Sequence, residues 1–215
     1  MVFYFTSSEG FTIYMGKDKF ENEDLIRYGF LEDIWFHVDD LSSAHVYLRL
    51  PIGKSKIEDI TPTCLEECAQ LVKENSIEGC KKKSVAVVYT KWRNLKKTPS
   101  MEVGQVGFNH PDRVRKYVVQ EKNRDILKAL NKTKVEEYPD LEEERRKREL
   151  LYKAERKKER QRLEAHERKA KEEWKQQKEL RSYSTLLSRE NIDAGTKLEA
   201  SADLSSVNAY EDDFM

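Results

Sequence analysis

The chain has few of the residues that build disulfide frameworks, metal sites or membrane spans. Its 215 residues include only three cysteines, Cys64, Cys68 and Cys80. Their odd number and the absence of a Cys-x-x-Cys spacing argue against a disulfide scaffold or a zinc site. No apolar run approaches the ~20 residues of a membrane-spanning helix, and no basic segment precedes an apolar run at the N-terminus. We therefore expect a soluble protein of the cytoplasm.

Sequence signatures of common enzymes are also missing. The chain contains no Walker loop, no nucleophile elbow and no His-Glu-x-x-His motif. His37 and His45 lie near several aspartates and serines, a set of side chains that a metal or acid–base site would use. Their spacing is not diagnostic, and histidines that stabilise a strand connection explain the same pattern. We expect no catalytic residues, no metal ligands and no cofactor.

Large apolar and aromatic residues are concentrated in residues 1–134, enough to form the core of one domain. The elements expected there are strands and helices in mixed order, which predicts an α+β fold with a mainly antiparallel sheet and packed helices. Strand-like composition is found at residues 2–6, 11–15, 34–38, 44–50, 85–90, 103–108 and 116–121.

Three helices are expected in this domain. The first is capped by Asp18, runs to about Tyr28, and packs Phe20 and its two apolar neighbours at 25 and 26 inward. Thr61 and Pro62 are a typical N-cap and first-turn proline for the second. A short closing helix is expected around residues 126–130. We expect residues 1–134 to fold on their own.

Residues 135–215 differ sharply in composition. The stretch 141–181 holds 16 basic and 11 acidic residues and lacks glycine and proline. Its few leucines keep no heptad register, which favours a solvated, largely monomeric helix over a coiled coil. Residues 135–182 are therefore interpreted as a charged helix, and residues 183–215 as a disordered acidic tail. Six glutamates precede a basic residue by four positions, a spacing that stabilises a helix: Glu142, Glu143, Glu144, Glu149, Glu164 and Glu167.

The first candidate binding element is a basic turn between the second strand and the first helix. A helix N-terminus favours anions, and the flanking lysines add positive charge. A phosphate group is therefore a candidate ligand, whereas an ordinary capped turn with exposed lysines is the alternative. The candidate residues are Gly16, Lys17, Asp18, Lys19, Phe20 and Glu21.

The second candidate is the segment 79–101, which contains no acidic residue. Basic side chains interleaved with aromatic ones suit phosphate contact combined with base stacking. A solvated lysine-rich loop with core aromatics would give the same composition. The candidate residues are Lys81, Lys82, Lys83, Lys91, Trp92, Arg93, Lys96 and Lys97.

Several motifs in order resemble NFACT-R domains across residues 1 to about 122: 13–19 with 21–23, 33–38 with 43–46, 88–90, 94–97 and 104–108. The resemblance implies RNA binding, because the domain is proposed to bind RNA in larger members that act in ribosome quality control. Similarity to one member of the family also implies DNA binding and a proposed role as a DNA sensor at the cell membrane.

The predicted function is non-enzymatic binding of nucleic acid, RNA or DNA, through a basic face that contacts the phosphate backbone. Two alternatives remain open. One is a membrane-associated DNA sensor or receptor, implied only by the resemblance. The other is a protein-docking adaptor that uses the helix at 141–181. Steep weakening by salt would indicate phosphate binding, because counterions are released, and would argue against docking through an apolar patch.

Overall fold

The computed structural model describes residues 1–53 and 56–181 of the chain. Seven strands form one sheet in the order β8-β5-β3-β4-β2-β1-β9, and every neighbouring pair is antiparallel. These strands are β1 (Val2–Thr6), β2 (Thr12–Gly16), β3 (Asp33–Val38), β4 (Val46–Arg49), β5 (Val85–Lys91), β8 (Arg115–Val119) and β9 (Val135–Glu137). A separate two-stranded ribbon consists of β6 (Leu95–Lys96) and β7 (Gly107–Phe108).

Four α-helices accompany the sheet in the described residues: α1 (Lys19–Tyr28), α2 (Pro62–Glu74), α3 (Arg124–Lys132) and α4 (Leu141–Arg181). Short 3-10 turns are η1 (Ile57–Asp59), η2 (Gly79–Lys81), η3 (Trp92–Asn94) and η4 (Pro111–Arg113). The predicted α+β class, the mainly antiparallel sheet and the long charged helix are confirmed. Residue 182 and the predicted acidic tail at 183–215 lie outside the described residues.

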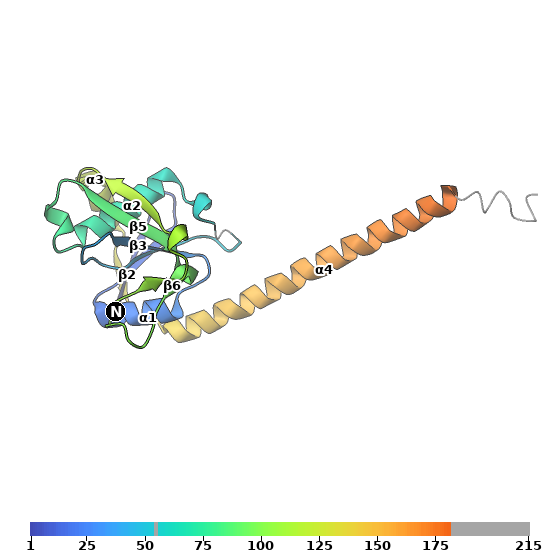
Figure 1. Ribbon diagram of the computed structural model, residues 1–215, viewed down its shortest axis with the longest axis horizontal. Helices are drawn as coiled ribbons and strands as arrows, with labels where there is room; N and C mark the ends of the chain where they lie inside the picture. The colour runs from blue at the N-terminus through green and yellow to red at the C-terminus, as the bar shows by residue number, and fades with distance from the viewer. Residues whose placement is uncertain (54–55, 182–215) are drawn as a thin grey trace, which may run out of the picture. The chain divides into compact units, whose positions relative to one another are not determined.

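Each face of the sheet buries its own apolar cluster, because successive strand residues point to opposite sides. Ile34 and Phe36 of β3 face a cluster that α2 and α3 cover, whereas Trp35 faces a second cluster. That second cluster includes Leu25 of α1 and is flanked by Phe108 of the ribbon. Helices α2 and α3 therefore lie on one side of the sheet, and α1 and the ribbon on the other (Figure 1).

Both predicted N-caps are confirmed. The Asp18 carboxylate accepts hydrogen bonds from the backbone N–H groups of residues 20 and 21 at 2.9 and 3.1 Å, and the Thr61 hydroxyl caps α2. The inward packing predicted for Phe20 is wrong, because its side chain is 64% exposed. Helix α1 buries Asn22 and Leu25, and a residue two positions before Asn22 points to the opposite side of a 3.6-residue turn.

The strand predicted at residues 103–108 is also wrong in most of its length. Gly104 adopts a φ of +84°, in the left-handed region that glycine tolerates. The N–H of Gln105 donates to the carbonyl of Glu102 at 2.9 Å, which closes a turn. Only the last two residues form a strand, and it belongs to the ribbon rather than to the main sheet. The outer strand that sequence analysis missed is β9, which pairs with β1.

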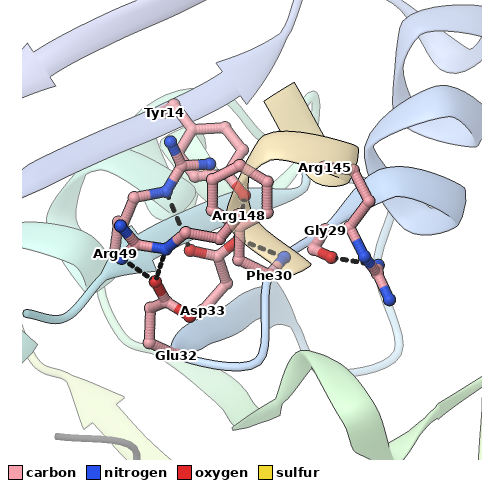
Figure 2. A network of polar contacts seen from close by, with 8 residues as sticks. All are labelled: Tyr14, Gly29, Phe30, Glu32, Asp33, Arg49, Arg145 and Arg148. Atoms are coloured by element: carbon pink, nitrogen blue, oxygen red, sulfur yellow. Dashed lines mark hydrogen bonds and ion pairs between the residues drawn. The ribbon is translucent and has the colours of Figure 1, made fainter. Parts of the chain in front are cut away.

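The first compact unit extends from Met1 to Leu151, so it includes β9 and the first turns of α4. Arg148 of α4 forms an ion pair with Glu32, whose side chain is only 2% exposed. Arg145 donates to the carbonyl of Gly29, and Figure 2 shows both arginines reaching the segment between α1 and β3. The start of α4 therefore belongs to the same packed unit as the sheet.

A second buried carboxylate lies beside this contact. The Asp33 carboxylate accepts hydrogen bonds from the Tyr14 hydroxyl at 2.6 Å, the Phe30 N–H at 2.7 Å and the Arg49 guanidinium at 3.2 Å (Figure 2). Burial, followed by the charge of Asp33, raises the pKa of Tyr14. These bonds satisfy a fully buried charge and fix the end of β3 against β2 and β4.

A second compact unit begins at Tyr152, and within it α4 continues to Arg181. No residue of α4 is buried. One of the glutamate–lysine ion pairs predicted from the sequence lies in the first turns of α4, where the Nζ atom of Lys147 is 3.1 Å from the Oε1 atom of Glu143. Such exposed pairs stabilise a helix modestly, by about 0.3–0.5 kcal/mol each.

Candidate nucleic-acid interface

The turn between β2 and α1 is held tightly at its first residue. A Cβ on Gly16 would lie 2.5 Å from the Oδ1 atom of Asn22, so the close approach requires glycine. The residues that follow are solvent-exposed, including Lys17 and Lys19. The structure therefore presents both lysines on the surface at the start of α1.

The N-terminus of α1 is already capped from within the chain. Hydrogen bonds from the backbone N–H groups of Glu21 and Phe20 lower the pKa of Asp18, which keeps this cap ionised. The Glu21 carboxylate pairs with the terminal ammonium of Met1. Two of the N–H groups that an anion would use are thus occupied. The turn offers the charges of Lys17 and Lys19 rather than an open helix end.

The loop that follows the ribbon strand β6 packs onto this turn. A Cβ on Gly104 would lie 3.3 Å from the Cβ of Lys19. The Gly104 N–H also donates to the Glu23 carboxylate at 2.6 Å. Two segments that are about 85 positions apart in the sequence are therefore neighbours at the start of α1.

Lys97 is the centre of that contact. Its ammonium donates to Glu23 at 2.5 Å and to the carbonyls of Glu102 and Gln105 at 2.6 and 2.9 Å. Desolvation opposes ionisation of Glu23, but the hydrogen bond from Lys97 lowers the pKa of that carboxyl. The charge of Lys97 is therefore neutralised inside the protein, whereas Lys96 remains exposed.

Trp92 lies at the opposite end of α1 and is partly buried. Its indole N–H donates to the carbonyl of Ile26 at 2.8 Å. The ring occupies the space that a side chain at position 29 would need, because a Cβ on Gly29 would lie 2.2 Å from the indole nitrogen. The Arg145 guanidinium lies over the ring, 4.7 Å from its centroid. These contacts give Trp92 a packing role between α1 and α4.

The predicted basic segment does not form a single patch. Lys81, Lys82 and Lys83 precede β5, and Lys91 ends it. A seven-residue strand separates its ends by about 20 Å. The carbonyl of Lys83 accepts a hydrogen bond from the buried Lys73 ammonium at 2.5 Å, so this end also has a structural function.

At the other end of β5, the structure adds cations that the sequence analysis did not include. A groove beside Lys91 and Arg93 is also lined by Arg113 and Arg115. The arginines come from η4 and the start of β8, beyond the segment that drew attention by its lack of acidic residues. The Arg-x-Arg pattern at 113–115 was the sequence signal for these cations. Its position beside Lys91 depends on the pairing of β5 with β8.

The two histidines do lie close together, with ring centroids 5.0 Å apart. The indole N–H of Trp35 donates to the Nδ1 atom of His45 at 3.1 Å. Desolvation, followed by the charge of His37, lowers the pKa of His45 to about 3. In residues 1–53 and 56–181, no three His, Cys, Asp or Glu side chains are grouped as metal ligands. Both imidazole rings pack against the ring of Trp35.

The sequence of this chain is similar to those of known proteins. The family model described as the NFACT protein RNA-binding domain matches residues 1–110. Coiled-coil domain-containing protein 25 of Bos taurus is 54% identical over 196 residues, 89% of this chain and 94% of its own length. The protein of the same name from Danio rerio is 58% identical over 148 residues, 67% of this chain and 71% of its own.

A solved structure shows the same fold at low identity. The C-terminal part of the fibronectin/fibrinogen-binding protein of Streptococcus suis superposes with a TM-score of 0.50 and 19% identity. The match covers 61% of this chain and 48% of that one. Neither the family description nor the relatives' names denote an enzyme. Among the helices that the structure describes, none has the length and apolar character needed to cross a membrane.

Proposed function

Because the chain belongs to the NFACT protein RNA-binding domain family, we propose that it binds RNA by contacting the phosphate backbone, without catalysis. The family match is the main support for this proposal. The matched residues 1–110 include the whole basic turn at the start of α1. We define the α1 surface by Lys17, Lys19 and Phe20. These residues face solvent, as does the capping residue Asp18 between the two lysines.

The α1 surface combines charge with an exposed ring. The Lys19 ammonium lies 5.4 Å from the centroid of the Phe20 ring, which is itself 64% exposed. Lysines attract phosphates as charges and carry little sequence information. An exposed aromatic ring supports stacking of an unpaired base, which adds about 1–3 kcal/mol per base. We therefore favour single-stranded RNA, with Phe20 in the stacking role that sequence analysis gave to Trp92.

The test is a fluorescence-anisotropy titration of the whole chain with single-stranded and double-stranded RNA and DNA at several salt concentrations. The Lys17→Ala/Lys19→Ala variant is expected to weaken binding equally across sequences. Each lost contact on a single strand reduces the slope of log affinity against log salt by about 0.7. Phe20→Ala is expected to weaken single-strand binding more than duplex binding.

The matched control is Lys128→Ala/Lys132→Ala. These two lysines are exposed on α3, which covers the other face of the sheet. The control removes the same charge and is expected to bind like the unchanged protein. Equal affinity of a folded Lys17→Ala/Lys19→Ala variant at low salt would contradict the assignment. Tighter binding of DNA than of RNA would favour the DNA-binding alternative, and salt-independent behaviour would favour protein docking.

A further inference from the structure

We propose that a groove at the end of β5 is a second site for a nucleic-acid backbone, distinct from the α1 surface. This Arg93 groove lies between η3, η4 and η1. The groove lies near the C-terminal end of α1, because Trp92, the neighbour of Arg93, donates a hydrogen bond to the carbonyl of Ile26. Lys17 lies before the N-terminal end of the same helix. Ten residues of helix separate the two regions by about 15 Å. The inference rests on the proposed RNA binding but on other residues.

The groove carries an excess of positive charge. Its basic residues are Lys91, Arg93, Arg113 and Arg115, and its acidic residues are Glu58 and Asp112. Arg115 pairs with Glu58, which also interacts with Lys91. Arg93 and Arg113 have no acidic partner among the described residues, and both are exposed. Two guanidinium groups, one from η3 and one from η4, are thus available to a ligand.

A buried hydrogen-bond network builds the groove independently of those arginine side chains. The Asn94 amide donates to the Thr90 hydroxyl at 3.0 Å and to the His110 carbonyl at 2.9 Å, and its oxygen accepts from the His110 N–H at 2.9 Å. The Thr90 hydroxyl donates to the Arg113 carbonyl at 3.3 Å. Asn94 and Thr90 are 7% and 0% exposed. The walls are therefore fixed while the charged groups stay free.

The chemistry of these groups favours phosphate. Arginine presents a planar set of donors that matches phosphate oxygens and can bind two of them at once. The groove has a volume of about 990 Å³, which is more than a single phosphate ion fills. A strand that passes through it can place successive phosphates near Arg93 and Arg113. Such contacts would be independent of sequence.

The experiment compares four forms of the whole chain in titrations with one fluorescein-labelled single-stranded RNA. These are the unchanged protein, Arg93→Ala/Arg113→Ala, Lys17→Ala/Lys19→Ala and the combination of both variants. Two lost contacts lower the salt slope by about 1.4, so the affinity lost between about 50 and 200 mM salt becomes roughly sevenfold smaller. We expect this for both variants, and additive effects when they are combined, because the two sites are far apart.

The outcomes separate the two proposals. Unchanged binding by the arginine variant, with weakened binding by the lysine variant, would overturn the groove and leave the proposed function standing. Absence of RNA binding by the unchanged protein would overturn both. Thermal unfolding monitors the fold of each variant. If the double variant is destabilised, Arg93→Ala and Arg113→Ala singly are each expected to lower the slope by about 0.7, and unchanged slopes in both would refute the groove.

Discussion

The ion pair between Arg148 and Glu32 offers a sharp test of the idea that the start of α4 completes the folded unit. The Glu32 side chain is 2% exposed and the Arg148 side chain 19% exposed. The Nε atom of Arg148 donates to the carboxylate at 2.6 Å. Replacing Arg148 with methionine keeps most of the side-chain volume but leaves the buried carboxylate without this arginine.

Removing one partner of a buried ion pair costs about 3–5 kcal/mol, because the remaining charge is left uncompensated. Since Arg148 is partly exposed, we expect Arg148→Met to lower the free energy of unfolding by about 3 kcal/mol, the lower end of that range. Changing Glu32 to Gln in the same chain removes the orphaned charge and is expected to recover part of the loss. The two changes would then be non-additive, as expected of contacting residues.

Urea unfolding followed by tryptophan fluorescence measures these changes, because Trp35 is buried in the folded protein and becomes exposed on unfolding. Arg146→Met is the matched control. Its side chain is 75% exposed and lies 4.0 Å from the Glu143 carboxylate, so its loss is expected to cost less than about 0.5 kcal/mol. Equal stability of Arg148→Met and Arg146→Met would refute a structural role of the Arg148–Glu32 pair.

Two further predictions follow from the same contacts and from the buried histidines. A chain ending at Leu151 is expected to unfold cooperatively in urea and to be several kcal/mol more stable than a chain ending at Lys134. The shorter chain lacks both β9 and Arg148, the partner of Glu32. Equal stability of the two chains would contradict this prediction. Because burial lowers the pKa of His45 from 6.5 to about 3, the unfolded chain binds a proton that the folded chain excludes, so stability is lost as pH falls below about 6.5. The slope contributed is at most about 1.4 kcal/mol per pH unit, and unfolding curves of His45→Gln are expected to lack it; identical pH dependence of the two proteins would refute this origin.

Local signals predicted the elements whose stability is local. Helix α4 begins where the charged stretch 141–181 begins, because closely spaced glutamate–lysine and glutamate–arginine pairs stabilise a helix without tertiary contacts. The predicted charged-helix segment 135–182 starts too early, because residues 135–137 form β9. The caps at Asp18 and Thr61 are equally local. By contrast, β9 has the unremarkable sequence Val-Glu-Glu, and it becomes a strand only because the exposed edge of β1 is available for pairing.

The candidate site was harder to predict, because sequence proximity says little about which charges share a surface. Lys83 and Lys91 belong to one acid-free segment, yet β5 places them at opposite ends of a strand. Arg93 and Arg113 are 20 positions apart, yet the hydrogen bonds of Asn94 and Thr90 place them around one groove. Strand order and side-chain networks, which depend on the whole fold, decide both results.

Lys97 explains why counting charges overestimates a binding surface. By composition it is equivalent to Lys96, its neighbour, but its ammonium is enclosed by Glu23 and two backbone carbonyls. An ammonium that already has three acceptors must break those bonds to contact a phosphate, and the carboxylate beside it would repel that phosphate. Replacing Lys97 would also leave Glu23 without its partner and release the loop that packs on Lys19. A loss of RNA affinity in such a variant would report a displaced loop, so the proposed interface is tested by changes at Lys17, Lys19, Arg93 and Arg113, with Lys97 kept intact.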